Sequence, residues 1–218
     1  MGIKDLTSFL NQKAPNAIQK KHLSEICDKE KMKIAIDTSL FMYKFKYSSG
    51  EKFLSKFLEQ INRLAINNIT PIYVFDGVPP SQKMKTIQQR KEKRDSYNQK
   101  IKDLNEQLDI NCENINNPNC ENLETLKIAN KELKEEINKL NKKTICVTKE
   151  NINQLKYFLD LLNIRYIHGN CEADLVCSKL CELNIVDMVL SDDMDHLTSG
   201  TKILIRDFHI NNNQVTTY

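Results

Sequence analysis

Three short apolar runs in this chain end in aspartate: Lys33–Asp37 (KIAID), Ile72–Asp76 (IYVFD) and Met188–Asp195 (MVLSDDMD). Runs of β-branched and aromatic residues without polar alternation are typical of strands that are buried on both faces of a parallel sheet. Ligands and catalytic groups gather at the carboxyl ends of such strands, along one edge of the sheet. The pattern therefore predicts an acidic cluster at that edge.

Six carboxylates make up the predicted cluster: Asp37, Asp76, Glu172, Asp174, Asp193 and Asp195. A lone aspartate at a strand end is usually only a cap or turn residue, but six that converge are hard to explain in that way. Neighbouring carboxylates repel one another unless one protonates or cations neutralise them. Ligand sets made only of oxygen favour Mg²⁺ or Mn²⁺ over zinc or copper.

The spacing of the last two acids fits a shared ion. Asp193 and Asp195 are two residues apart, so in an extended segment both side chains point to the same side. Two Mg²⁺ ions about 4 Å apart would activate a water, bind a scissile phosphate and stabilise the leaving oxygen. This chemistry requires no histidine.

A basic segment accompanies the acids. Residues 83–94 contain six lysines and arginines against one glutamate, a local net charge of +5, whereas the formal charge of the whole chain is only +3. In an enzyme that cuts nucleic acid, basic residues would bind the phosphate backbone and metal ions would lie at the bond that is cut. The alternative interpretation of the segment is a solvated face of a helix.

Strands and helices alternate around these acids, which predicts an α/β fold. The expected strands are 33–37, 71–76, 165–167, 188–191 and 202–206, and the expected helices are 5–10, 17–27, 53–67, 151–162 and 172–183. The first two strands and the helix between them form a βαβ unit whose crossover should be right-handed.

Residues 81–145 differ from the rest because they are polar and contain no glycine. Apolar residues recur there with heptad spacing in two stretches: Ile101, Leu104 and Leu108, then Leu123, Leu126, Leu133, Ile137 and Leu140, with Asn130 in one seam position. The pattern predicts a helical hairpin that projects from the α/β part. The alternative is two solvated helices that only pack on each other.

Other features narrow the class of protein. Seven cysteines without a CxxC pair, and a start that is not a signal peptide, favour reduced thiols in an intracellular protein that is not secreted. No apolar run is long enough to cross a membrane, and no glycine-rich phosphate loop supports ATP use. His168, Cys171, Cys177 and Cys181 could be drawn as a zinc site, but their spacing fits no standard finger.

Several segments, in order along almost the whole chain, resemble the flap endonuclease family of structure-specific 5′-nucleases. They are MGIKDLTSFL, AIDTSLFMYKF, YVFDGVPP, the CEAD segment and SDDMDHLTSG. A DGxPP turn after an apolar strand is highly specific when a DMD triplet before LTxG accompanies it. The resemblance implies a PIN-like, three-layer α/β fold with a central, mostly parallel sheet and an inserted helical arch at 81–145.

The resemblance also implies an activity. It is that of a Mg²⁺-dependent 5′-flap endonuclease or 5′–3′ exonuclease, which acts on DNA in replication and repair by two-metal phosphodiester hydrolysis. One ion would be surrounded by Asp37, Asp76, Glu172 and Asp174, and the second would be held by Asp193 and Asp195. Asp174 stands where the family usually has glutamate, so its carboxylate reaches one methylene less far.

By the same resemblance, other residues would contact a DNA partner that has a 5′ flap or a 5′ single-stranded end. Lys83 and Arg90 match arch residues that contact the scissile phosphate, where cations stabilise the charge of the transition state. Lys93 and Arg94 would be contacts to the DNA backbone. Tyr43 matches a tyrosine that stacks on a base beside the cut; its alternative is a half-buried core tyrosine.

Gly2 matches a glycine whose backbone lies close to the substrate after Met1 is removed. In the family, a helix–turns–helix region that grips the duplex and carries one further aspartate ligand follows the DMD segment. This sequence stops at Tyr218, so we interpret 1–218 as the catalytic domain without that region. A sliding clamp would therefore bind through a region outside this sequence.

Two other functions stay open at this point. A PIN-like endoribonuclease would cut RNA with the same carboxylates, and a non-catalytic scaffold would only bind nucleic acid. The basic arch favours the flap nuclease, because threading or clamping a 5′ end requires it. All six carboxylates are present, which disfavours the scaffold. A function on DNA implies the nucleus or another site of DNA replication.

Overall fold

The computed structural model describes residues 3, 5–27, 31–115, 122–209 and 213–218. The chain divides into two compact units, one made of residues 1–80 and 147–218 and the other of residues 81–146. The first is called the α/β body below, and the second the hairpin unit. The hairpin unit is thus an insertion between two halves of the α/β body.

The described part of the α/β body holds one seven-stranded sheet with the order β1-β7-β6-β5-β2-β3-β4. The strands are β1 (Gln19–His22), β2 (Met32–Asp37), β3 (Ile69–Phe75), β4 (Tyr166–His168), β5 (Met188–Leu190), β6 (Leu204–Arg206) and β7 (Gln214–Thr217). Strands β2 to β6 are parallel to one another. At one edge of the sheet, β7 pairs antiparallel with β6, and β1 pairs antiparallel with β7. The prediction of a mostly parallel α/β sheet is confirmed.

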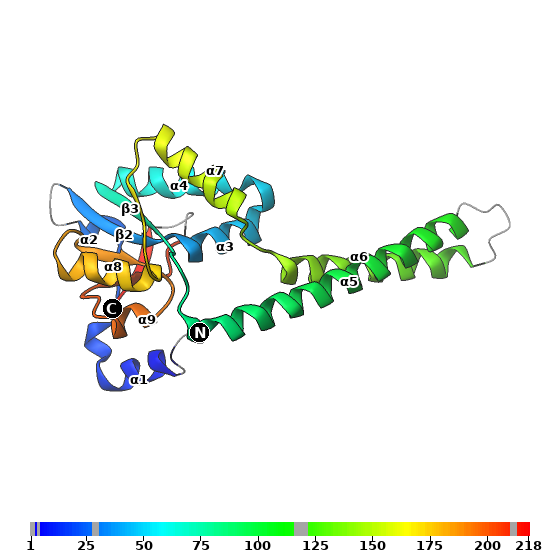
Figure 1. Ribbon diagram of the computed structural model, residues 1–218, viewed down its shortest axis with the longest axis horizontal. Helices are drawn as coiled ribbons and strands as arrows, with labels where there is room; N and C mark the ends of the chain where they lie inside the picture. Colours follow the sequence, from blue (N-terminus) through cyan, green and yellow to red (C-terminus); the bar gives the residue numbers. More distant parts are fainter. Residues whose placement is uncertain (1–2, 4, 28–30, 116–121, 210–212) are drawn as a thin grey trace. The chain divides into compact units, whose positions relative to one another are not determined.

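Helices cover both faces of this sheet (Figure 1). They are α1 (Leu6–Lys13), α2 (Leu23–Ile26), α3 (Thr38–Ser49), α4 (Phe53–Ile66), α7 (Lys149–Leu161), α8 (Ala173–Glu182) and α9 (Asp195–Thr198). Single 3₁₀ turns lie at Pro15–Ala17 and Gly50–Lys52. Helices α2, α3, α4 and α7 pack on one face, and α1, α8 and α9 on the other.

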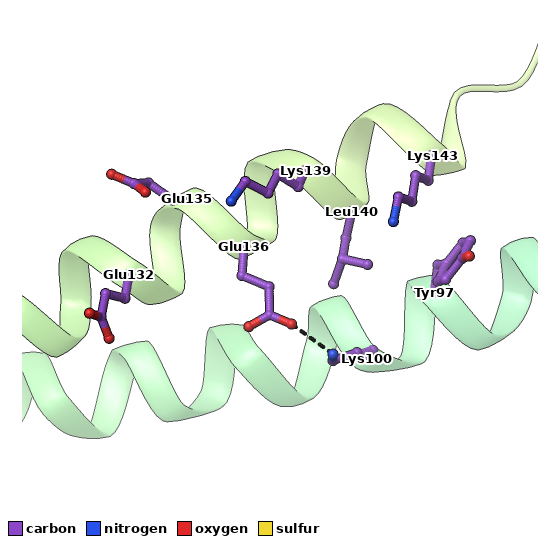
Figure 2. Close-up of a pocket in the computed structure, with 8 residues that line it drawn as sticks. All are labelled: Tyr97, Lys100, Glu132, Glu135, Glu136, Lys139, Leu140 and Lys143. Atoms are coloured by element: carbon purple, nitrogen blue, oxygen red, sulfur yellow. Dashed lines mark ion pairs between the residues drawn. The ribbon is translucent and has the colours of Figure 1, made fainter.

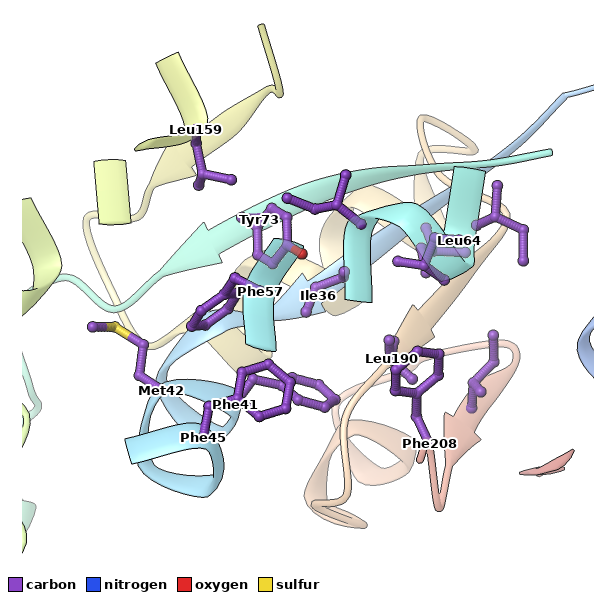
Figure 3. Packing of buried hydrophobic residues seen from close by; sticks show 14 of the residues in the cluster. Ile36, Phe41, Met42, Phe45, Phe57, Leu64, Tyr73, Leu159, Leu190 and Phe208 are labelled. Atoms are coloured by element: carbon purple, nitrogen blue, oxygen red, sulfur yellow. The ribbon is translucent and has the colours of Figure 1, made fainter. Parts of the chain in front are cut away.

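Alternation along β2 explains the two faces. Ile34 and Ile36 belong to the larger apolar cluster, and Ala35 belongs to the smaller one on the opposite face. Figure 3 shows the larger cluster, in which Phe57 stacks edge-on against Tyr73 with ring centroids 5.7 Å apart. The small Ala35 side chain lets α8 approach the sheet closely on the second face.

Asparagine ends three of the helices. Asn68, Asn163 and Asn184 follow α4, α7 and α8 with φ angles of 56°, 53° and 56°. Asparagine visits this left-handed region more readily than other residues with a side chain, so it can replace glycine at a helix end. The chain contains only five glycines, and these asparagines turn it from each helix toward the next strand.

The prediction of one helix over 17–27 was wrong. The chain instead forms strand β1, followed by the short helix α2. A capping box starts α2, because His22 Nδ1 accepts the Ser24 N–H while Glu25 accepts the backbone N–H of His22. Strand β1 forms because Gln19 pairs with Thr217 of β7, and β7 had no sequence-based prediction.

The hairpin unit consists of a 3₁₀ turn at Ser81–Lys83 and the helices α5 (Met84–Ile115) and α6 (Leu123–Thr144). Leu104, Ile137 and Leu140 form its buried core. Asn130, which occupies a seam position, accepts a hydrogen bond of 2.9 Å from the Asn111 side chain on the facing helix. The predicted seam residues Ile101, Leu104, Leu108, Leu133, Ile137 and Leu140 thus lie at the contact between α5 and α6, whereas Leu123 is exposed.

A groove between α5 and α6 carries charged residues of both signs (Figure 2). Lys100 Nζ lies 2.7 Å from Glu136 Oε1 across the hairpin. The hydrogen bond from Lys100 and then its charge lower the pKa of Glu136. No described helix of either unit has the length and apolar character that crossing a membrane requires.

Candidate active site

The predicted acids lie at one edge of the sheet. Strand β2 ends at Asp37, Asp76 follows the last residue of β3, and residues 191–195 follow β5. These three strands are adjacent and parallel, with β2 between the other two, and Ile36 of β2 is level with Leu190 of β5. The carboxyl ends of the three strands therefore bring acids from distant parts of the sequence to the same edge, as parallel pairing dictates.

Helix α8 adds two acids to this edge. Glu172 is its N-cap residue and Asp174 lies in its first turn. Asp76 Oδ1 accepts the backbone N–H of Ala173 at 2.8 Å, which ties the end of β3 to the start of α8. A carboxylate at a helix N-terminus is stabilised by the N–H groups and the dipole there.

A buried thiol lies near three of these acids. Cys177 of α8 is fully buried. Burial first, and then the negative charges of Asp37, Asp174 and Asp76, raise the pKa of its thiol well above the ordinary value. Carboxylates from β2, from the end of β3 and from α8 thus act on one sulfur atom, so the three groups share one region of the α/β body.

Asp37 is held by donors from two directions. Its Oδ1 accepts the N–H of Leu40 at 3.4 Å, because Asp37 is the N-cap of α3. Its Oδ2 accepts the Ser191 hydroxyl at 3.3 Å, and His196 Nε2 lies 3.7 Å from the same oxygen. The side chain of Asp37 is 15% exposed, so part of the carboxylate is open to a ligand.

The segment after β5 folds back on its own acids. Ser191 Oγ accepts the N–H of Asp193 at 3.2 Å, and Asp193 Oδ1 accepts the N–H of Asp195 at 3.1 Å. Asp195 Oδ1 in turn accepts the N–H of Ile3 at 2.9 Å. Successive backbone donors therefore orient Asp193 and Asp195.

The neighbouring Asp192 has a different environment. Its carboxylate forms a 2.8 Å ion pair with Lys44 and accepts the backbone N–H of Asp207 at 3.0 Å. Its carbonyl oxygen accepts a hydrogen bond from Arg206. Asp192 thus connects the segment to α3 and to the end of β6, and both of its carboxylate oxygens are used in that structural role.

The donor set suits a hard divalent cation. Among the described residues, no lysine or arginine forms an ion pair with Asp37, Asp76, Asp193 or Asp195. Within the same part of the chain, no three His, Cys, Asp or Glu side chains are grouped closely enough to hold one ion together, and this includes the zinc alternative. Backbone N–H groups donate to one carboxylate oxygen of Asp37, Asp76, Asp193 and Asp195. The metal ligands therefore stay a prediction.

Comparison with known proteins adds independent information. The XPG N-terminal domain matches residues 1–97, and the XPG I-region matches residues 163–218. The two models leave the hairpin between them and together match most of the chain. The chain belongs to the XPG and flap endonuclease family.

Individual relatives agree with this family. Flap endonuclease 1 of Cryptosporidium muris is 33% identical over 226 residues, which cover 97% of this chain and 42% of the relative. Flap endonuclease 1 of Plasmodium falciparum is 32% identical over 224 residues, which cover 96% of this chain and 30% of the relative. The chain thus spans less than half the length of these curated relatives.

Solved structures share the fold. The catalytic core of Rad2 in complex with DNA substrate (complex III) superposes with a TM-score of 0.65 at 23% identity, over 100% of this chain and 55% of that one. The Holliday junction-resolving enzyme GEN1, in complex with product DNA and Mg²⁺, has a TM-score of 0.59 at 18% identity, over 100% and 40%. The PIN-like nuclease fold expected for the family is confirmed.

The residues that the family resemblance assigns to DNA lie in both units. Tyr43 belongs to α3 of the α/β body and is 48% exposed, so part of its side chain is accessible and its contact with a base stays a prediction. Lys83 ends the 3₁₀ turn of the hairpin unit, and Arg90, Lys93 and Arg94 lie on α5. Gly2 lies outside the described residues.

Sequence reasoning missed two residues that lie beside Asp37. Ser191 and His196 both face the Asp37 carboxylate, and both are fully buried. The only local signal was their position beside the DMD triplet. The sequence does not show that the histidine points inward, because that depends on how α9 packs against α8.

Proposed function

We propose that this protein is a Mg²⁺-dependent nuclease that cuts DNA at 5′ flaps or at 5′ single-stranded ends. One observation carries the proposal: Asp37, Asp76 and Asp193 end or follow three adjacent parallel strands, so their carboxylates lie along one edge of the sheet. Such a concentration of negative charge at the carboxyl edge of a parallel sheet suits divalent cations. Membership of the family and the likeness to nucleases that bind DNA support the same reaction.

The family resemblance supplies the assignment of the metal ligands. We propose that one ion is held by Asp37, Asp76, Glu172 and Asp174, that a second is held by Asp193 and Asp195, and that Mn²⁺ can substitute for Mg²⁺. When bound, the ions would lower the pKa of a water, so that a nucleophile is available at neutral pH, and would neutralise charge on the phosphate and the leaving oxygen. The chain contributes orientation: the N–H groups of Leu40, Ala173 and Ile3 fix the carboxylates before the substrate arrives.

Contacts to the DNA complete the proposal. Lys83 and Arg90 would contact the scissile phosphate, where a cation stabilises charge that develops in the transition state. Lys93 and Arg94 would bind the DNA backbone, and backbone contacts of this kind make affinity depend on salt. We further propose that the exposed ring of Tyr43 stacks on an unpaired base and that the backbone of Gly2 lies near the cut.

The hairpin unit would act as the arch that receives the 5′ strand. Basic residues are concentrated on the first turns of α5, and α5 and α6 hold each other through their own buried core. A protein with this activity works where DNA is copied and repaired, in the nucleus or another DNA-containing site. We also propose that a sliding clamp recruits the protein to this DNA.

A cleavage assay on matched substrates tests the function. A labelled 5′-flap DNA duplex, the same flap in RNA and a blunt DNA duplex are incubated with Mg²⁺ or with a chelator. We expect incision at the flap junction of the DNA substrate only when Mg²⁺ is present. Equal cutting of plain RNA would instead support an endoribonuclease, and binding without any cutting would support a scaffold.

Asp193→Ala tests the metal assignment. Because it removes a proposed ligand, we expect turnover to fall by more than about 100-fold. Losing a residue that only hydrogen-bonds to a metal ligand costs up to about 100-fold. DNA binding in the presence of chelator should change little. Glu182→Gln, which removes an exposed acid at the far end of α8, is the matched control and should leave turnover unchanged. Near-normal turnover of Asp193→Ala would show that the assignment is wrong.

A further inference from the structure

His196 is a polar residue in an apolar place. Its side chain is fully buried, and neither ring nitrogen has a hydrogen-bond partner in the described structure. The backbone around it is well held, because its carbonyl oxygen accepts the N–H of Thr201 at 3.1 Å and the hydroxyl of Ser178 at 3.4 Å. A buried polar group without a partner is rare in native proteins, so its presence calls for a reason.

The ring faces one acceptor. His196 Nε2 lies 3.7 Å from Asp37 Oδ2, slightly beyond a hydrogen bond, and Ser191 Oγ donates to the same oxygen at 3.3 Å. Among the described residues Nδ1 has no hydrogen-bond partner, so Nε2 is the ring nitrogen that can direct an N–H group toward this carboxylate. The N–H of Leu40 holds the other oxygen of Asp37 at 3.4 Å.

We propose that His196 is a positioning residue that fixes the Asp37 carboxylate for the divalent cation, an inference that rests on the proposed function. Carboxylates that bind metals are usually held by hydrogen-bond donors behind them, and these donors set the affinity of the site. Each carboxylate oxygen has two lone pairs, so Asp37 can accept these donors on its buried side and still offer lone pairs to an ion.

The charges around Asp37 explain why such support is needed. Asp37, Asp76 and Asp174 all contribute to raising the pKa of the Cys177 thiol, and carboxylates gathered in one region repel one another unless cations neutralise them. A donor fixed inside the protein holds the carboxylate in place against this repulsion. His196 follows Asp195 directly, so the same short helix α9 supplies a proposed ligand and a support for another.

The experiment measures metal binding without DNA or turnover. Mn²⁺ is titrated into the protein, and the free ion is followed by its electron paramagnetic resonance signal. His196→Leu, which fills the space without a donor, should raise the Mn²⁺ concentration at half-saturation about 10- to 100-fold. His196→Gln, whose amide nitrogen reaches the position of Nε2, should recover most of that loss. His196→Asn, whose amide reaches only the position of Nδ1, should not.

Ser178→Ala is the structural control. It removes the hydroxyl that contacts the carbonyl of His196 and leaves the ring intact, so it should lower the melting temperature without changing Mn²⁺ affinity. The proposal is overturned if the Leu variant binds Mn²⁺ like the wild type, if Ser178→Ala weakens binding as much, or if Gln and Asn behave alike. The Gln and Asn pair decides the matter should the Leu variant not fold. A wild-type protein that binds no Mn²⁺ would instead refute the proposed metal site itself.

Discussion

Gly77→Ala should displace Asp76 without touching any carboxylate. Gly77 follows Asp76 directly, and its N–H donates to the carbonyl oxygen of Cys171 at 2.8 Å. A Cβ added to Gly77 would lie 2.1 Å from the carbonyl oxygen of Gly169. The loops after β3 and β4 pass so close to each other that only glycine fits between them.

The size of the displacement follows from this distance. Ordinary carbon–oxygen contacts are about 3.3 Å, so the backbone must move by about 1.2 Å. The neighbouring backbone atoms leave little room, because the carbonyl carbon of Asn170 would lie only 2.7 Å from the new Cβ. A misplacement of about 1 Å at a catalytic centre can lower the rate about 100-fold, and overpacking of this kind destabilises by about 1–3 kcal/mol.

Flap cleavage and urea denaturation measured side by side test the reasoning. Gly50→Ala is the control, because Gly50 has φ +57° and ψ −127° and no atom lies near its added Cβ. The variant should lose about 1–3 kcal/mol of stability and keep its activity. Gly77→Ala should lose both stability and activity, together with Mn²⁺ affinity. If Gly77→Ala is as active as Gly50→Ala at equal stability, the close approach does not position Asp76.

Two further predictions concern the arch and the buried thiol. Arg90→Ala should slow single-turnover cleavage about 100-fold and change DNA affinity little, because it removes charge stabilisation in the transition state. Lys102→Ala on the same helix is the control. If Arg90→Ala lowers only the DNA affinity, Arg90 is a contact to the DNA backbone instead. Because burial and nearby carboxylates raise the pKa of Cys177, its protonated thiol contributes stability at neutral pH that is lost as the pH rises above the ordinary thiol value. Between pH ~8.5 and ~10 the free energy of unfolding should therefore fall in the wild type by up to about 2 kcal/mol more than in Cys177→Ala. Urea denaturation at each pH measures both proteins. Parallel pH profiles of the two proteins would contradict this prediction.

Local patterns in the sequence predicted the elements that carry the site. Apolar runs located β2, β3 and β5, and each ends at or just before an aspartate. The seam spacing located the helices of the hairpin unit, where Leu104 and Ile137 are buried as expected. These predictions succeed because the periodicity of burial is written in neighbouring residues.

The elements that depend on distant partners were not predictable in this way. Strand β1 was interpreted as helix, because residues 17–27 alone do not show that Gln19 pairs with Thr217, nearly the whole chain away. The two adjacent acids Asp192 and Asp193 look equivalent in sequence. Asp192 is engaged by Lys44, which lies 148 residues earlier and reaches it only in the folded chain.

The sequence by itself determined that acids follow parallel strands and so share an edge. Only the tertiary structure decided which donors hold each acid: Leu40 and Ser191 hold Asp37, Ala173 holds Asp76, and Ile3 holds Asp195. It also turned His196 inward toward Asp37, since the packing of α9 sets that direction. The physical reason is that burial patterns are local properties of a chain, whereas hydrogen bonds between distant segments exist only once the sheet has assembled and excluded water.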